Sequence, residues 1–103
     1  MAMQINSSTA GDKVTIKLAG RFDFNDHRSI KSAYEPALQQ AEVKRLEIDL
    51  AEIEYLDSSA LGMLMLMRER VLAAGKTVVL SKPSKTVAQI LDIANFSKLF
   101  TIL

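Results

Sequence analysis

Apolar residues in this chain repeat with a period of two in some segments and with a period of three to four in others. Val14, Ile16 and Leu18 alternate with polar or small residues, and positions 46, 48 and 50 repeat the pattern. A period of two indicates a strand with one buried face, because successive side chains of a strand point to opposite sides. We therefore expect strands near 14–19 and 46–50, and shorter ones near 4–7, 77–80 and 101–103.

Three segments have the spacing of helices. The first begins at a cap at Asn25 or Asp26, and Pro36 inside it predicts a kink or a broken hydrogen bond. The second runs from about residue 58 to 74 and is ended by Gly75, and the third begins at Pro83-Ser84 and stops at Asn95. The apolar positions of the first helix are Ile30, Ala33, Tyr34, Ala37, Leu38 and Ala41, and those of the third are Val87, Ile90, Leu91 and Ala94. Residues 53–56 are expected to form a loop.

This order of strands and helices predicts an α/β fold with a small mixed β-sheet that contains parallel crossovers. At least two strands are polar on one side, so the helices should pack mainly on one face of the sheet. A chain of 103 residues suits one domain, residues 1–103.

Composition narrows the classes of function. The net charge of +1 provides no general attraction to nucleic acid or to a membrane surface. The chain has no cysteine, which excludes disulfides and thiolate metal sites, and the start of the sequence lacks the pattern of a signal peptide. No apolar run is long enough to span a bilayer. We expect a soluble cytoplasmic protein.

The tripeptide Asp57-Ser58-Ser59 stands immediately before an apolar helical segment. Asp and Ser side chains commonly cap the free N–H groups of a helix start, so a cap is the simplest interpretation. No Glu or Gln follows three residues later, so the reciprocal capping box is absent. Gly62 falls in the first helical turns, where glycine costs about 1 kcal/mol relative to alanine. Close approach of a neighbouring loop, close approach of a partner, or packing against the sheet would each explain this glycine.

A longer pattern around this tripeptide resembles the signature of STAS domains, in particular of anti-sigma factor antagonists. The similar residues are Asp49-Leu50-Ala51-Glu52-Ile53-Glu54-Tyr55-Leu56-Asp57-Ser58-Ser59-Ala60-Leu61-Gly62. The similarity continues at Gly20-Arg21-Phe22-Asp23, in the strand–Pro–helix region and at the Phe96-X-X-Leu99-Phe100 ending. It implies a STAS domain that spans residues 1–103.

The resemblance implies a regulatory module that changes partners on phosphorylation. The unphosphorylated protein would bind a histidine-kinase-like serine kinase that doubles as an anti-sigma factor, or an analogous target. The kinase would inactivate it by phosphorylation, and a PP2C-type phosphatase would restore it. A non-phosphorylated STAS scaffold, or a sensory domain that binds a small ligand, is the alternative. Neither implies nucleic-acid binding.

The phosphoacceptor of the family maps onto Ser58, with the adjacent Ser59 as the fallback. The helix dipole and free N–H groups would tolerate the added charge. In a partner interface, however, the dianion would suffer desolvation and like-charge repulsion. The partner-binding residues that the resemblance implies are Asp23, Asp57, Ser58, Ser59, Leu61, Gly62 and Met63.

The remaining candidates have simpler interpretations. Of the apolar residues after the motif, Leu61, Leu64, Met65 and Leu72 can serve the core. The core is also the simpler interpretation of each methionine taken singly, whereas Met63, Met67 and Gly62 together are a candidate docking face. His27 has no second ligand at metal spacing and is expected at the surface. Tyr55 is expected to pack. No nucleophile–base constellation or Gly-rich phosphate loop is present, so we expect neither an enzyme nor a cofactor.

Overall fold

The computed structural model describes residues 3–103 of the chain, and its helices and strands alternate as the sequence patterns predict. The elements in order are β1 (Gln4–Ala10), β2 (Lys13–Phe22), the 3₁₀ helix η1 (Phe24–Asp26), α1 (His27–Leu38), β3 (Arg45–Leu56), α2 (Ser58–Ala73), β4 (Thr77–Ser81), α3 (Lys85–Ile93), the 3₁₀ helix η2 (Phe96–Lys98) and β5 (Thr101–Ile102). Within the described residues, no helix is both long and apolar enough to cross a membrane.

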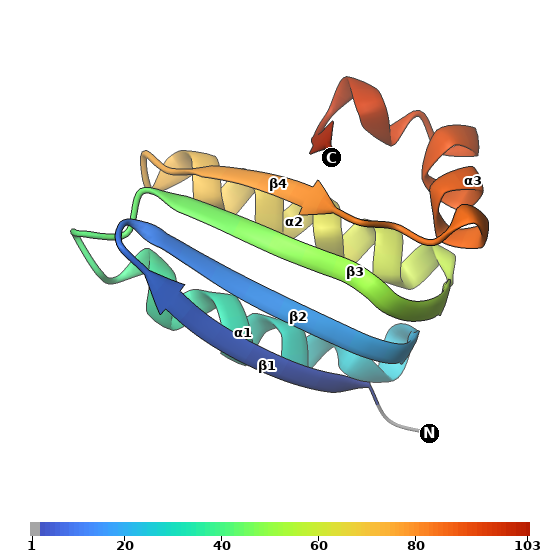
Figure 1. Cartoon of the computed structure of the whole chain (residues 1–103), viewed down its shortest axis with the longest axis horizontal. Helices are drawn as coiled ribbons and strands as arrows, with labels where there is room; N and C mark the ends of the chain where they lie inside the picture. The colour runs from blue at the N-terminus through green and yellow to red at the C-terminus, as the bar shows by residue number, and fades with distance from the viewer. Residues whose placement is uncertain (1–2) are drawn as a thin grey trace.

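The five strands form one mixed sheet in the order β1-β2-β3-β4-β5 (Figure 1). β1 pairs with β2 antiparallel, and every later pair is parallel. The parallel register places Phe22 beside Leu56, so β2 and β3 end next to each other. The loops that follow these two strands therefore emerge side by side.

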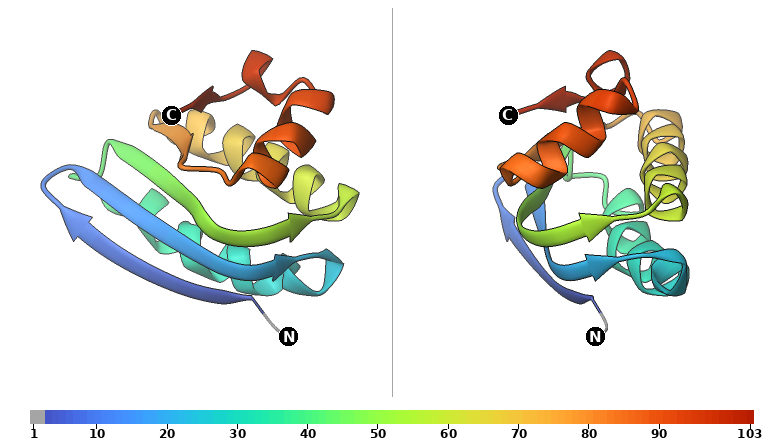
Figure 2. Two further views of the ribbon diagram at one scale, coloured as in Figure 1. Left: turned by 45° about the vertical axis from the view of Figure 1, so that its right-hand side comes forward. Right: turned by 90° about the vertical axis from the view of Figure 1, so that its right-hand side faces the viewer.

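α1 and α2 cover the same face of the sheet, whereas α3 lies off the carboxyl end of β4 (Figures 1 and 2). Alternate residues of β2 and β3, including Ile16, Leu18 and Ile48, are completely buried beneath the helices. Val87 and Leu91 of α3 belong to the same core. The fold class predicted from the sequence, a small mixed sheet with helices mainly on one face, is confirmed.

The opposite face of the sheet carries ion pairs. Lys13 Nζ lies 3.0 Å from Glu47 Oε1, and Ser81 Oγ donates to Glu47 Oε2 at 2.7 Å. These partners hold the pKa of Glu47 below its ordinary value, with the Ser81 hydrogen bond as the largest cause and the Lys13 hydrogen bond next. Polar networks therefore replace apolar packing on this side.

Two sequence-based boundaries were wrong. The segment 53–56 is not a loop, because β3 continues through it to Leu56 by pairing with the end of β2, where Ile53 lies beside Gly20. Two register shifts in this pairing, each with one extra residue on β3, let it continue, and Gly20 adopts a φ of 98°, which favours glycine. The first helix ends at Leu38, so Ala41 lies beyond it and is exposed. Pro36 is accommodated inside α1 near its end.

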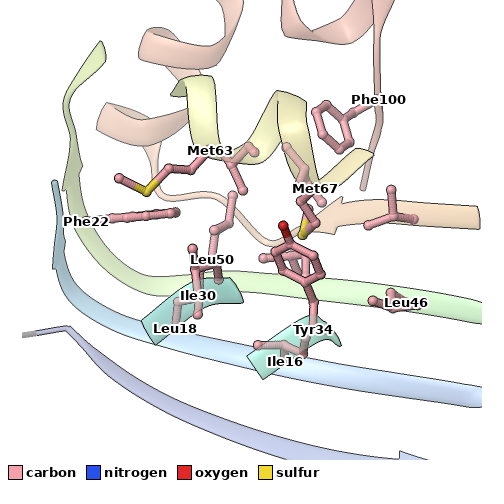
Figure 3. Packing of buried hydrophobic residues seen from close by; sticks show 14 of the residues in the cluster. Ile16, Leu18, Phe22, Ile30, Tyr34, Leu46, Leu50, Met63, Met67 and Phe100 are labelled. Carbon is pink, nitrogen blue, oxygen red and sulfur yellow. The ribbon is translucent and has the colours of Figure 1, made fainter. Parts of the chain in front are cut away.

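The methionine-rich helix α2 buries only part of the predicted set: Leu64 is buried and Leu61 is partly buried, as expected, but other predicted core residues are not. Met63, Leu64 and Met67 are at most 8% exposed, and Met63 and Met67 point from α2 towards the sheet (Figure 3). Met65 and Leu72, expected in the core, are 44% and 46% exposed. Met67 therefore serves the core, the simpler interpretation, and the alternative in which it belongs to a docking face is wrong. An all-apolar segment has no polar face to indicate which side is buried, and the sheet alone decides it.

Candidate functional site

The site lies where β2 and β3 end and two helical segments begin. The N–H of Asp57 donates to the carbonyl oxygen of Phe22 at 3.3 Å, one residue beyond the last paired positions of the two strands. This bond ties together the chain segments that carry Asp23 and Asp57. Residues separated by more than thirty positions are thereby placed at one edge of the molecule.

Asp57 caps α2. Its Oδ1 accepts a hydrogen bond from the N–H of Ala60 at 2.8 Å, and its carbonyl accepts the first helical bond, from Leu61, at 3.2 Å. An extended backbone at Asp57, with ψ at 179°, is typical of the N-cap position. The simple interpretation of this aspartate as a cap is confirmed, and it explains why the helix begins here.

Ser58 and Ser59 occupy the first two positions of α2, and both are exposed. Ala60 follows them and is completely buried, so the chain turns into the core immediately after the two serines. A helix leaves its first N–H groups without intrahelical partners, and the Asp57 carboxylate satisfies the one at Ala60. Both hydroxyls are accessible to a modifying enzyme, so exposure alone does not distinguish Ser58 from Ser59.

Asp23 caps η1 in a reciprocal arrangement with Asp26. The Asp23 carboxylate accepts from the N–H of Asn25 at 2.9 Å, while Asp26 Oδ2 accepts from the N–H of Asp23 at 2.9 Å. Asp26 occupies the N-cap position of α1, as predicted, but its side chain makes no capping bond to α1 and instead accepts from Asp23 at the start of the preceding η1. Asp26 is only 6% exposed and was missed as a site residue, although the Asp-X-X-Asp spacing contains the signal of a capping box.

A shallow hollow separates the two helix starts. It is lined by Phe24, His27, Ser59, Gly62, Met63 and Leu66 and measures about 450 Å³. Phe24 is 67% exposed and Leu66 is 43% exposed, which is unusual for such side chains so close to each other. Neither residue was a candidate from the sequence. His27 is exposed, as predicted.

Gly62 is exposed on α2, and a Cβ atom built there would meet nothing within 4 Å. Packing against the sheet and close approach of a neighbouring loop, two of the three explanations offered by the sequence, are therefore wrong. Of the remaining expected contact residues, Leu61 is half-buried against the core and Met63 is 8% exposed. The glycine keeps the floor of the hollow open.

Tyr55 does not pack in the core. It is 40% exposed, and the guanidinium of Arg21 lies 4.7 Å from the centre of its ring. The two residues are paired across β2 and β3, immediately before Phe22 and Leu56, so they point to the other side of the sheet. Exposed cation–π pairs contribute about 0.5–1 kcal/mol.

Within residues 3–103, no group of three or more His, Asp or Glu side chains could hold a metal ion. The chemistry that the arrangement offers consists of two exposed hydroxyls, two capping carboxylates and an apolar hollow beside them.

The fold and the capped helix start define a STAS domain. The family model described as "Mlab, STAS domain" matches residues 5–103, and the chain belongs to this family. A STAS-domain-containing protein of Pseudomonas aeruginosa (strain UCBPP-PA14) is 40% identical over 102 residues, which cover 99% of each chain.

Solved structures share the fold. The anti-sigma factor antagonist SpoIIAA in its unphosphorylated form has a TM-score of 0.78 and 20% identity, covering 99% of this chain and 88% of that one. The Bacillus cell fate determinant SpoIIAA in its phosphorylated form has a TM-score of 0.71 and 20% identity, covering 99% of this chain and 91% of that one. At this identity the likeness concerns the fold.

Proposed function

We propose that this STAS domain is a phospho-switched binding module whose phosphoacceptor is Ser58. The observation that carries the proposal is the exposed Ser58 hydroxyl at the first position of α2, next to the Asp57 cap. SpoIIAA, which shares the fold, has been solved in phosphorylated and unphosphorylated forms. Its partner would be a histidine-kinase-like serine kinase that acts as an anti-sigma factor, or an analogous target, and a PP2C-type phosphatase would reverse the modification.

The hollow beside Ser59 would be the contact surface for the unmodified protein. Phe24 and Leu66 offer apolar area, and each of the capping carboxylates, Asp23 and Asp57, lies one or two residues along the chain from a residue that lines the hollow. Interfaces derive most of their affinity from a few such apolar anchors. Within the originally expected set, Gly62 and Ser59 would be contacted directly, whereas Leu61 and Met63 would support them from below.

Phosphorylation would act by changing charge at this surface and not by unfolding the domain. A phosphate adds about 1.5–2 negative charges. The start of α2 stabilises such charge through its dipole and free N–H groups, so the helix can persist. Asp57 directly precedes Ser58 and Asp23 lies at the end of the neighbouring strand, and both would oppose burial of the dianion in an interface.

The test is intact-mass analysis of the whole chain after incubation with ATP and the histidine-kinase-like serine kinases encoded in the same genome. We expect the mass of one phosphate group to be added to the native chain and to Ser59→Ala, but not to Ser58→Ala. Modification that persists in Ser58→Ala and is lost in Ser59→Ala would show that Ser59, and not Ser58, is the phosphoacceptor. If none of these kinases phosphorylates the native chain, the proposed switch is contradicted.

A binding experiment separates the switch from a constitutive scaffold. The native chain should bind the kinase, and Ser58→Asp should bind at least about tenfold more weakly, since a buried uncompensated charge costs more than 1.4 kcal/mol. Ser59→Ala, which changes the adjacent residue without adding charge, is the control and should weaken binding by much less than Ser58→Asp. Undiminished binding by Ser58→Asp, without phosphorylation of the native chain, would favour the scaffold alternative.

A further inference from the structure

β1 forms an outer edge of the sheet, and within residues 3–103 no strand pairs with its free side (Figure 1). An edge strand presents a row of backbone N–H and C=O groups that can pair with another strand. Natural edges are usually protected by charged residues, proline, bulges or short length. β1 has seven residues, Gln4–Ala10, with no charge and no proline, and its register with β2 is continuous.

The inner side of this edge is incompletely filled. Ile5, Ser7 and Thr9 face the helices, because they lie opposite the buried residues Leu18, Ile16 and Val14. The short side chains of Ser7 and Thr9 leave a hollow of about 270 Å³ between β1 and α1. Its lining residues are Ser7, Thr9, Val14, Ser32, Ala33, Pro36, Ala37 and Gln40. An added strand would place side chains over this hollow.

We propose that β1 pairs antiparallel with β1 of a second copy of this chain, with Ser7 facing Ser7 across a two-fold axis. In this register all seven residues pair, and odd-numbered residues meet odd-numbered residues. Alternate residues of an edge strand direct their backbone N–H and C=O groups towards the free side. Because odd-numbered residues meet odd-numbered residues, the residues that do so on one copy face the residues that do so on the other. The sheets of the two copies become continuous.

The side chains of this register are complementary. Ile5 of each copy lies beside Thr9 of the other, on the helix side, where the hollow has room for an apolar group. On the open side Asn6 faces Ser8, so neutral polar groups meet. The absence of charge on β1 means that two identical strands meet without the like-charge repulsion that a lysine-bearing edge would produce. A second copy is for these reasons the occupant we assign.

This surface is separate from the Ser58 site, since Ser58 follows β3, and β2 lies between β1 and β3 in the sheet. The helix α2 packs on β3 and β4 and not on β1. Self-pairing can therefore fail or succeed independently of the proposed phosphorylation. One strand pair contributes less than the roughly 1,200 Å² typical of stable interfaces, so the dimer is expected to dissociate on dilution.

Cysteine crosslinking tests the register, because the chain has no native cysteine. Ser7→Cys places two thiols opposite each other at a Cα separation of about 4.5–5.5 Å, within disulfide range. Thr9→Cys is the matched control: it is equally exposed and on the same face, but its thiols would be about 14 Å apart along the strands. We expect Ser7→Cys to form a covalent dimer at least about tenfold faster under mild oxidation. Equal rates, a faster Thr9→Cys reaction or no dimer from either variant would overturn the proposal.

A charge experiment provides a second readout by analytical ultracentrifugation. Asn6→Lys/Ser8→Lys should shift the chain to monomer, whereas Asn6→Asp/Ser8→Lys should retain concentration-dependent dimerisation, since unlike charges would then face each other. Circular dichroism checks that both variants fold. Native chain that remains monomeric at all concentrations, or identical behaviour of the two double variants, would also overturn the proposal.

Discussion

The backbone N–H of Asp57 donates to the carbonyl of Phe22, and this single bond aligns the starts of η1 and α2. Each start is capped by its own aspartate, Asp23 for η1 and Asp57 for α2. The two caps are built from residues far apart in the sequence, yet parallel pairing of β2 and β3 brings them to one edge. The proposed switch site depends on this pairing as much as on the serines themselves.

Replacement of the α2 cap should destabilise the domain modestly. Asp57→Ala removes the acceptor for the Ala60 N–H, and we expect the free energy of unfolding to fall by about 1 kcal/mol. Asp57→Asn keeps a good capping oxygen and should remain within a few tenths of a kcal/mol of the native value. Urea denaturation measures both. Equal stability of Asp57→Ala and the native chain would show that the hydrogen bond from the Ala60 N–H to Asp57 does not stabilise the domain.

The buried and exposed methionines of α2 should respond differently to truncation. Met67 is completely buried, so Met67→Ala should lower the free energy of unfolding by about 2–5 kcal/mol through lost burial and a cavity. Met65 is 44% exposed, and Met65→Ala should cost less than about 1 kcal/mol. Thermal or urea unfolding provides the comparison. A larger effect at position 65 would contradict the observed orientation of α2.

Lys76 holds the loop between α1 and β3. Its ammonium is buried and donates to the carbonyls of Gln40 and Val43, at 2.8 and 2.5 Å. Lys76→Ala leaves both carbonyls without this donor, so we expect a loss of about 2–3 kcal/mol in chemical denaturation. Lys44→Ala, at an exposed lysine in the same loop, should change stability by less than about 0.5 kcal/mol. Similar small losses of stability in Lys76→Ala and Lys44→Ala would refute the role of Lys76 in holding this loop.

Glu47 should make stability depend on acid pH. Its folded-state pKa lies below the ordinary value of 4.5, so its stabilising contribution is complete above about pH 4.5 and is lost as the pH falls through the lower folded-state value. Glu47→Gln should therefore flatten the fall in the free energy of unfolding between about pH 6 and about pH 3. Urea denaturation at a series of pH values measures this fall in the native chain and in Glu47→Gln. An unaltered slope in Glu47→Gln would argue against the prediction.

Much of the fold followed from periodicity. Alternation at Ile16 and Leu18, and again at Ile48 and Leu50, identified the two central strands, and the helix starting at Ser58 followed from its cap and apolar run. The end of a strand could not be predicted from periodicity where it depends on pairing with a neighbouring strand. The end of β3 is a strand because β2 lies beside it, although its own residues suggested a loop.

The sequence by itself determined the alternation of strands and helices, the Asp57 cap and the two candidate serines, because these depend on short-range spacing and backbone chemistry. Only the tertiary structure decided that Phe24 and Leu66 meet beside Ser59, that Met67 faces inward while Met65 faces water, and that Asp26 is buried. These outcomes depend on which surfaces the sheet presents to each helix. Contacts between residues distant in the chain are set by strand pairing and packing, and no local pattern encodes them.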